Sequence, residues 1–264
     1  MVTWHLMTES VRGASHHRNN LRNQDAVGHY QAAAGAPLIV AVADGHGSKR
    51  CTHSHLGAQF AVQAAIESVQ TVFGSANLTM SQIRMLAETL PKTISHCWRD
   101  KVDNYIDYLR IEAPLKKPRY LPFGTTLLVV CVLKECILFW QIGDGDIAVI
   151  NSDNTLITPI PDDARLLGND TTSLCNNDAW ADFRCAFLPL VEELPKAIFL
   201  VSDGYKNSFK QTEGFYQALI DINDYMSDEG AEWVAQELAD WLNDTSQQGS
   251  GDDISMAVIY TNRV

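Results

Sequence analysis

Four short apolar segments of this chain each adjoin an aspartate, and this pattern constrains the fold more than any other feature. The pairs are AVGHY after Asp25, LIVAVA before Asp44, AIFLV shortly before Asp203, and ISMAVIY shortly after Asp252. Short runs rich in β-branched residues that stop at polar turns are typical of buried β-strands. An isolated Asp next to Gly is usually an ordinary turn residue. Four at strand ends predict instead that carboxylates from distant parts of the chain meet at one edge of a sheet, where they could bind hard divalent cations.

Helical and strand-like segments alternate along the rest of the chain. Apolar residues recur near helical spacing in four stretches, at 56–69, 94–106, 215–222 and 231–242. The runs GTTLLVVCVL, CILFWQIG and DIAVIN predict a three-stranded antiparallel meander over residues 124–151. The stretch 151–193 is polar and irregular, so we expect a flap or long loop there. Periodicity alone therefore indicates a mixed α and β fold.

Length and hydropathy favour a single domain over residues 1–264. With 264 residues, of which 46% are hydrophobic, the chain can bury one substantial core, and no linker or internal repeat divides it. The longest apolar run, 125–133, is far shorter than the roughly 20 residues of a membrane-spanning helix. The N-terminus lacks the features of a secretory signal. We therefore expect a protein without a membrane association.

Net charge and cysteine content limit the cellular compartments and the classes of partner that suit this protein. A formal net charge of −12 would repel nucleic acid and anionic membranes, and it favours cations as ligands. The six cysteines are scattered without a CxxC pair, which suits a reducing cytoplasm. Cys97 lacks the downstream Arg of a cysteine-phosphatase loop, so a covalent cysteine mechanism is not expected. Val42 occupies the place of the first P-loop glycine before Gly47, so a nucleotide cofactor site is not expected either.

Six motifs in a fixed order resemble the type 2C metal-dependent protein phosphatases. They are NQDA (23–26), VADGHG (42–47), FGTT (123–126), IGDGD (142–146), VSDG (201–204) and GDDIS (251–255). The segments GASHHRNNLRNQDA and GNDTTSL are most similar to small, stand-alone bacterial members. The resemblance implies an α+β fold in which a four-layer αββα sandwich holds two antiparallel sheets between helix pairs.

The resemblance also implies a metal site and a general acid. Asp44 would bridge two Mg²⁺ or Mn²⁺ ions, one of which the Gly45 carbonyl would bind, while Asp203 and Asp252 would hold the other. Asp25 would anchor metal-bound water. Asp144 matches the position at which bacterial members bind a third ion. His46 matches the residue thought to protonate the leaving oxygen, so the catalytic set would comprise Asp25, Asp44 and His46.

Elementary chemistry agrees with this assignment. Two divalent ions lower the pKa of a bridging water and neutralise charge during in-line attack on phosphorus, so the nucleophile would be a metal-activated bridging hydroxide. An imidazole such as that of His46 is suited to giving a proton to a departing serine or threonine alkoxide. The alternative for His46 is a turn histidine that only packs or caps.

Two positions depart from the family pattern. Gln24 stands where many members carry Glu, which replaces a carboxylate by a neutral amide. The phosphate-binding Arg of the family would fall at Asn20, so Arg18 and Arg22 are the candidates for this contact. Gln24 and the missing arginine keep open the alternative of a catalytically weak phosphatase-like module that binds phosphoproteins or a kinase.

The resulting prediction is a cytoplasmic serine/threonine protein phosphatase. Its partners would be phosphoserine and phosphothreonine proteins and, by resemblance, a cognate serine/threonine kinase in a signalling pathway. We expect a monomer that binds neither nucleic acid nor membrane. A metal-dependent hydrolase of small phosphoesters is a further alternative, because the same site could perform that reaction.

Overall fold

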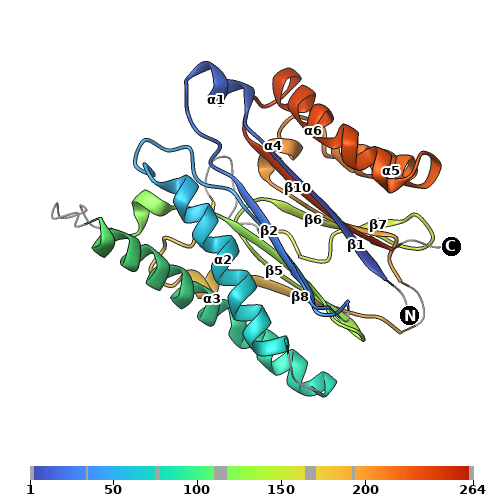
Figure 1. Cartoon of the computed structure of the whole chain (residues 1–264), viewed down its shortest axis with the longest axis horizontal. Helices are drawn as coiled ribbons and strands as arrows, with labels where there is room; N and C mark the ends of the chain where they lie inside the picture. The colour runs from blue at the N-terminus through green and yellow to red at the C-terminus, as the bar shows by residue number, and fades with distance from the viewer. Residues whose placement is uncertain are drawn as a thin grey trace.

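Two five-stranded antiparallel sheets form the centre of the protein (Figure 1). The structure is a computed structural model, and it describes residues 3–33, 35–74, 78–109, 118–163, 171–191 and 194–261. One sheet has the order β1 (Trp4–Val11), β10 (Ile254–Thr261), β9 (Ala197–Val201), β6 (Asp146–Ile150), β7 (Leu156–Ile157). The other has the order β2 (Ala26–Gln31), β3 (Leu38–Ala43), β4 (Leu127–Val132), β5 (Cys136–Ile142), β8 (Arg184–Pro189).

A pair of long helices covers the outer face of each sheet, so the expected four-layer αββα sandwich is confirmed (Figure 1). Helices α2 (Ser54–Phe73) and α3 (Met80–Tyr108) pack on the β2–β8 sheet. Helices α5 (Thr212–Asp228) and α6 (Ala231–Gln248) pack on the other sheet. The short helical elements are α1 (Ala14–Arg18), η1 (Leu121–Phe123), η2 (Ala179–Asp182) and α4 (Asp203–Lys206).

The alternation of side chains along β3 shows how the layers are joined. Leu38, Val40 and Val42 belong to the core between the two sheets, together with residues of β6, β9 and β10. The intervening residues of β3 face α2 and α3. Because both faces of this strand are buried, the run is apolar throughout instead of alternating.

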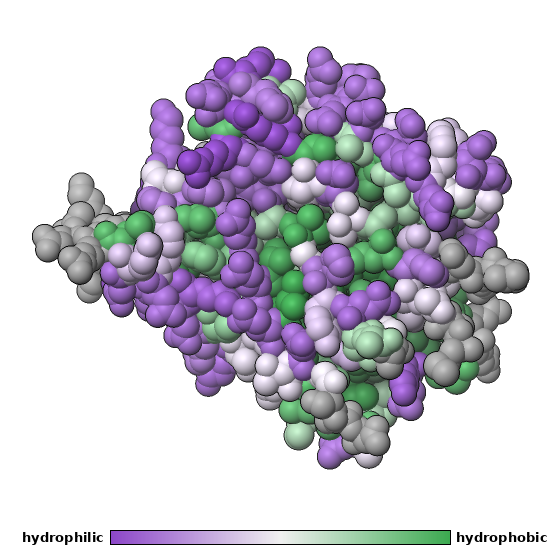
Figure 2. All heavy atoms as spheres, viewed as in Figure 1, coloured by the Kyte–Doolittle hydropathy of each residue, from purple (hydrophilic) through white to green (hydrophobic). Residues whose placement is uncertain are grey.

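Close backbone contacts and a cap fix the helices on the sheets. Gly57 lies so near η1 that an added Cβ would stand 1.9 Å from the Phe123 carbonyl oxygen. The buried Trp98 indole donates a hydrogen bond of 2.9 Å to the Gly57 carbonyl. Thr79 and Gln82 form a capping box at the start of α3. On the face shown in Figure 2, hydrophilic side chains predominate over the helices. Among the described residues, no helix combines the length and apolar character that crossing a membrane requires.

The predicted three-stranded meander is wrong in its last strand. β4 and β5 pair as expected, but β6 belongs to the opposite sheet, where Asp146 pairs with Val201 of β9. The chain changes sheets at Gly143, whose φ of +97° is in the region that favours glycine. Apolar runs identify strands but do not specify the sheet that each strand joins.

The stretch 151–193 is more ordered than a loop. Its described part contains β7, η2 and β8, and β8 pairs with β5 at the edge of its sheet. Residues 164–170 and 192–193 lie outside the described part, and so does the beginning of the GNDTTSL motif. The strand β1, which the sequence analysis did not predict, pairs along its whole length with β10.

Candidate active site

Strand register brings the four predicted aspartates to one end of the sandwich. In the β2–β8 sheet, Ala26 pairs with Ala43, so Asp25 and Asp44 lie side by side at the strand ends. In the other sheet β9 and β10 are antiparallel neighbours, so Asp203 after β9 and Asp252 before β10 lie at the same end. The two sheets therefore contribute two carboxylates each.

A cavity of about 920 Å³ opens at this end of the molecule. Its lining includes most of the predicted site residues, namely Asp44, Gly45, His46, Asp144, Asp203 and Asp252. Asp25 is not part of the lining and has 8% of its surface exposed. Arg18 and Arg22 are not among the lining residues, and the Arg22 guanidinium instead lies 3.3 Å from the His55 ring nitrogen.

Burial and mutual repulsion raise the pKa values of these carboxyl groups. The pKa of Asp25 rises to about 8, mainly because the group is desolvated, although hydrogen bonds from Ser202 and Ser255 oppose the rise. Burial also raises the pKa of Asp44 well above its ordinary value, and the charges of Asp25 and Asp203 add to this shift. Burial raises the pKa of Asp203 as well, and the charges of Asp144 and Asp252 add to this shift, although hydrogen bonding with Asp44 and a hydrogen bond from the Asn207 amide oppose it. Several carboxylates in one buried site need compensating positive charge.

The donor set fits divalent cations. Asp25 Oδ2 is buried without a hydrogen-bond partner among the described residues, and such an atom is costly unless another group binds it. The oxygens of Asp44, Asp203 and Asp252, together with the Gly45 carbonyl, form an all-oxygen set of the kind that Mg²⁺ and Mn²⁺ prefer.

The FGTT motif holds the turn that presents Asp44. The Asp44 amide donates to the Thr126 hydroxyl (3.1 Å), and the Asp44 carbonyl accepts from the Thr126 amide (2.8 Å) and from the Thr125 hydroxyl (2.8 Å). The Gly45 amide donates to the Gln24 carbonyl (3.1 Å). A side chain at Gly45 would stand 2.6 Å from that oxygen, so glycine is required for this close approach.

His46 is half-buried beside the segment that begins at residue 171. Its Nε2 lies 2.8 Å from the Ser173 hydroxyl. Burial lowers the pKa of the imidazole, and the negative charge of Asp144 partly offsets this effect. Asp144 itself accepts a hydrogen bond of 3.0 Å from the Thr171 hydroxyl. The same segment therefore contacts both the predicted general acid and the predicted third-metal residue.

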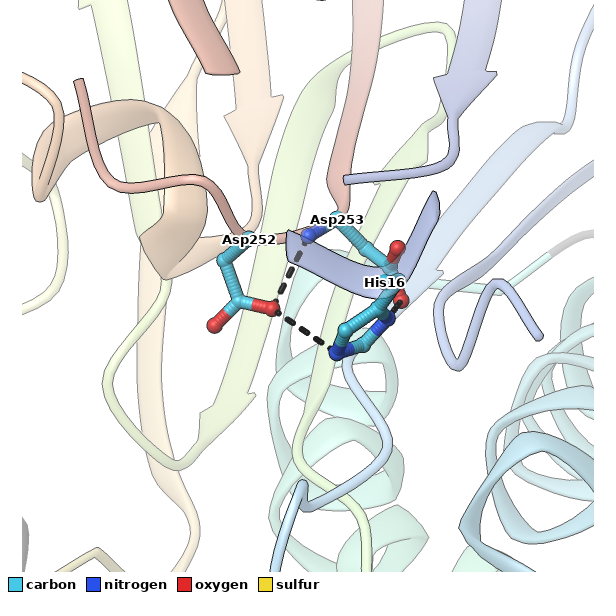
Figure 3. Close-up of side chains that lie close together, drawn as sticks. All are labelled: His16, Asp252 and Asp253. Atoms are coloured by element: carbon cyan, nitrogen blue, oxygen red, sulfur yellow. Dashed lines mark hydrogen bonds and ion pairs between the residues drawn. The ribbon is translucent and has the colours of Figure 1, made fainter. Parts of the chain in front are cut away.

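Sequence reasoning missed a histidine–carboxylate cluster behind Asp252 (Figure 3). His16 Nδ1 lies 2.7 Å from Asp253 Oδ2, and Nε2 lies 3.6 Å from Asp252 Oδ1. The adjacent carboxylate of Asp253 raises the pKa of His16, although burial opposes this rise. His16 belongs to the motif GASHHRNNLRNQDA, and the two aspartates belong to GDDIS. Nothing in the sequence indicated that these two motifs are in contact.

Comparison with known proteins agrees with this geometry. The family model "Protein phosphatase 2C" matches residues 12–243. The serine/threonine phosphatase Stp1 from Staphylococcus aureus is 17% identical, with a TM-score of 0.63 and coverage of 100% of this chain and 96% of that one. The catalytic domain of the phosphatase PstP, solved with two manganese ions, is 14% identical, with a TM-score of 0.60 and full coverage of both chains.

A third similar structure is PppA of Pseudomonas aeruginosa, described as a key regulatory component of T6SS. It is 15% identical, with a TM-score of 0.60 and coverage of 98% of both chains. No curated protein matches the sequence significantly. These structural likenesses establish the shared fold, and the match of the family model over most of the sequence establishes the family. The chain belongs to the protein phosphatase 2C family.

Proposed function

We propose that this protein is a metal-dependent serine/threonine phosphatase that hydrolyses phosphoserine and phosphothreonine in other proteins. The observation that carries this proposal is the convergence of four aspartates from both sheets beside His46, with the pKa raised at Asp25, Asp44 and Asp203. Family membership and the activity named for Stp1 and PstP support the same reaction. The presence of all four carboxylates favours catalysis over a module that only binds phosphoproteins.

The carboxylates would divide the binding of two Mg²⁺ or Mn²⁺ ions between them. Asp44 would contact both ions and the Gly45 carbonyl one of them, while Asp203 and Asp252 would hold the other. Asp25 would act beneath them through water, and Asp144 would hold a third ion. When bound, such ions supply an activated water and neutralise the charge of the phosphoryl oxygens.

The protein's own residues would complete the reaction. His46 Nε2 would give its proton to the seryl or threonyl oxygen as the P–O bond breaks, because an alkoxide is a poor leaving group. The cavity lining would hold the phosphoryl group over the carboxylate cluster. Arg18 and Arg22 remain the phosphate contacts predicted from sequence, and both stand outside the lining residues.

The finer biological assignments are also part of the proposal. All six cysteines are unpaired, which supports a reducing cytoplasm. We expect a monomeric, single-domain enzyme that works opposite a serine/threonine kinase, with a flap within the stretch 151–193 outside the paired strand β8. The phosphoprotein substrate and the choice between Mg²⁺ and Mn²⁺ depend on experiment.

A panel of substrates tests the proposed function. Phosphate release from phosphothreonine, phosphoserine and phosphotyrosine peptides and from p-nitrophenyl phosphate should be measured with Mn²⁺, Mg²⁺ or EDTA. The proposal predicts metal-dependent turnover of the phosphothreonine and phosphoserine peptides. Turnover of p-nitrophenyl phosphate alone would indicate a small-phosphoester hydrolase, and absence of turnover would indicate a binding module.

A further inference from the structure

We propose that His16 is a positioning residue that orients Asp252 through Asp253, an inference that rests on the proposed metal-dependent function. His16 lies on α1, near the N-terminus, and the two aspartates immediately precede β10 near the C-terminus. Figure 3 shows the imidazole between the two carboxylates. The arrangement joins the two ends of the chain at the predicted metal site.

Asp253 is the fixed centre of this cluster. Its side chain is 3% exposed, and its Oδ2 lies 2.7 Å from His16 Nδ1. The same carboxylate accepts hydrogen bonds of 2.6 Å from the amides of Gly13 and Gln24. A buried carboxylate that accepts two backbone hydrogen bonds and lies against an imidazole is held in one orientation, because losing one of these partners would leave buried charge uncompensated. Through Gln24, this carboxylate also anchors the residue that precedes Asp25.

The backbone of Asp253 also holds the side chain of Asp252 in place. The Asp253 amide donates a hydrogen bond of 2.9 Å to Asp252 Oδ1, the oxygen that also faces His16 Nε2. Figure 3 shows the other carboxylate oxygen of Asp252 pointing away from His16. Asp252 lines the cavity, whereas His16 and Asp253 do not. One oxygen of Asp252 is therefore held from behind while the other is available to a cation.

The backbone around His16 is itself fixed against the same turn. The Ser15 amide donates to the Gly251 carbonyl (2.8 Å), and Arg12 donates to the His16 carbonyl (2.9 Å). A Cβ at Gly13 would stand 2.3 Å from the Asp252 carbonyl carbon, so the two segments are in direct backbone contact. This geometry gives the imidazole a fixed place from which to orient its partner.

Removing groups that orient metal ligands typically weakens metal affinity by about 10- to 100-fold. We therefore expect His16→Leu to weaken Mn²⁺ binding within this range, and His17→Leu, a change at the exposed neighbouring histidine, to leave it unaltered. His16→Asn keeps a donor near the position of Nδ1, so it should bind Mn²⁺ within a few-fold of the unsubstituted protein. His16→Gln places its donor near Nε2 and should be as weak as His16→Leu.

Calorimetric titration with Mn²⁺ and thermal melting in EDTA test this inference. The expected result is weak Mn²⁺ binding by the Leu and Gln variants, recovery in the Asn variant, and melting of the Gln and Asn variants at similar temperatures. Should His16→Leu fail to fold, the Mn²⁺ affinities of His16→Asn and His16→Gln still test the inference. Equal Mn²⁺ affinity of these two variants would overturn the inference. If the unsubstituted protein bound no Mn²⁺, the proposed function itself would fail.

A second observation concerns the substrate phosphate. Among the described residues, three Lys and Arg side chains line the cavity, and the geometry points to Arg50 as the one that binds the phosphoryl group. Lys206 is paired with Asp146 at 2.8 Å, and Arg184 donates to the carbonyls of Pro161 and Gly143. The Arg50 side chain is exposed and has no partner among the described residues. It lies four residues after His46, and a guanidinium matches phosphate oxygens in a bidentate geometry.

Kinetics on a phosphothreonine peptide separate Arg50 from the arginines predicted by sequence. Arg50→Ala should raise KM about 10-fold or more, in the range of a lost charge-assisted hydrogen bond. Lys49→Ala, a charge-matched change outside the cavity lining, should leave KM within about 2-fold, and Arg50→Lys should recover only part of the loss. A rise in KM with Arg22→Ala or Arg18→Ala but not with Arg50→Ala would overturn this assignment. Inactivity of the unsubstituted protein would instead contradict the proposed function.

Discussion

The imidazole Nε2 of His46 lies 2.8 Å from the Ser173 hydroxyl, so an alcohol oxygen already occupies hydrogen-bonding distance from the predicted general acid. The Ser173 hydroxyl also lies 3.1 Å from the Thr125 carbonyl and 3.2 Å from the Thr125 amide, which places it firmly against the FGTT motif. Ser173 therefore orients the imidazole, and the lowered pKa of His46 favours its neutral form in the protein without substrate.

His46→Gln should affect substrates according to their leaving groups. A phosphothreonine peptide leaves as a high-pKa alkoxide, so its kcat should fall by roughly 10²-fold or more, whereas p-nitrophenyl phosphate should change much less. Measuring kcat for both substrates at saturating Mn²⁺ across pH 6 to 9 checks this expectation. Ser173→Ala is the control, because it removes the partner of His46 without removing the imidazole. Equal losses on both substrates, or a loss cured by added metal, would show that His46 instead orders the turn.

Mn²⁺ binding should tighten as pH rises. The pKa of Asp25 is raised to about 8 and those of Asp44 and Asp203 lie above their ordinary values, so protons compete with the cation over the acidic and neutral range. Binding must displace these protons. Titration calorimetry in buffers of different ionisation enthalpy, from pH 5 to pH 8.5, measures the protons released. An affinity that does not change with pH would contradict the raised pKa values.

Without bound cations, the carboxylate cluster should lower the stability of the folded protein. Because the folded-state pKa values are raised, the carboxyl groups favour folding most at low pH and lose that contribution as pH rises from about 4 through about 8. Asp44→Asn removes one of the mutually repelling charges. In EDTA, its melting temperature should therefore increase relative to the unsubstituted protein as pH rises. A difference that is constant or shrinks would count against the electrostatic account.

The cysteines should not take part in the chemistry. Cys51 and Cys175 line the cavity, but burial raises the pKa of both thiols, which disfavours the nucleophilic thiolate. Each of the six cysteines replaced singly by Ser should keep turnover within a few-fold, apart from stability losses at buried positions. Assays of the six variants at saturating Mn²⁺ decide the point. A single replacement that stops turnover would indicate a covalent mechanism.

The aspartates could be predicted from sequence because each adjoins a recognisable apolar strand. The register of β2 against β3, and of β9 against β10, then places Asp25, Asp44, Asp203 and Asp252 together. The four-layer architecture came from the family resemblance, since periodicity indicated only mixed α and β. The transfer of β6 to the second sheet could not be predicted, because an apolar run carries no information about its partner strand.

Contacts between distant segments also escaped the sequence analysis. His16 and Asp253 lie 2.7 Å apart although they are near opposite ends of the chain, and no local pattern links them. The contact of His46 with Ser173 depends on the tertiary packing of the segment that begins at residue 171. Arg50 follows the DGHG turn directly, but only the cavity distinguishes it from Lys49. Such relationships depend on tertiary structure.

The most direct test of the proposed metal-dependent mechanism is phosphate release from a phosphothreonine peptide by the unsubstituted protein and by Asp44→Asn, each with Mn²⁺ and with EDTA. We expect turnover only by the unsubstituted protein with Mn²⁺, because Asp44 would contact both cations that activate water and neutralise the phosphoryl charge. Circular dichroism should show that the variant remains folded. Near-normal turnover by Asp44→Asn, or turnover by the unsubstituted protein in EDTA, would contradict it.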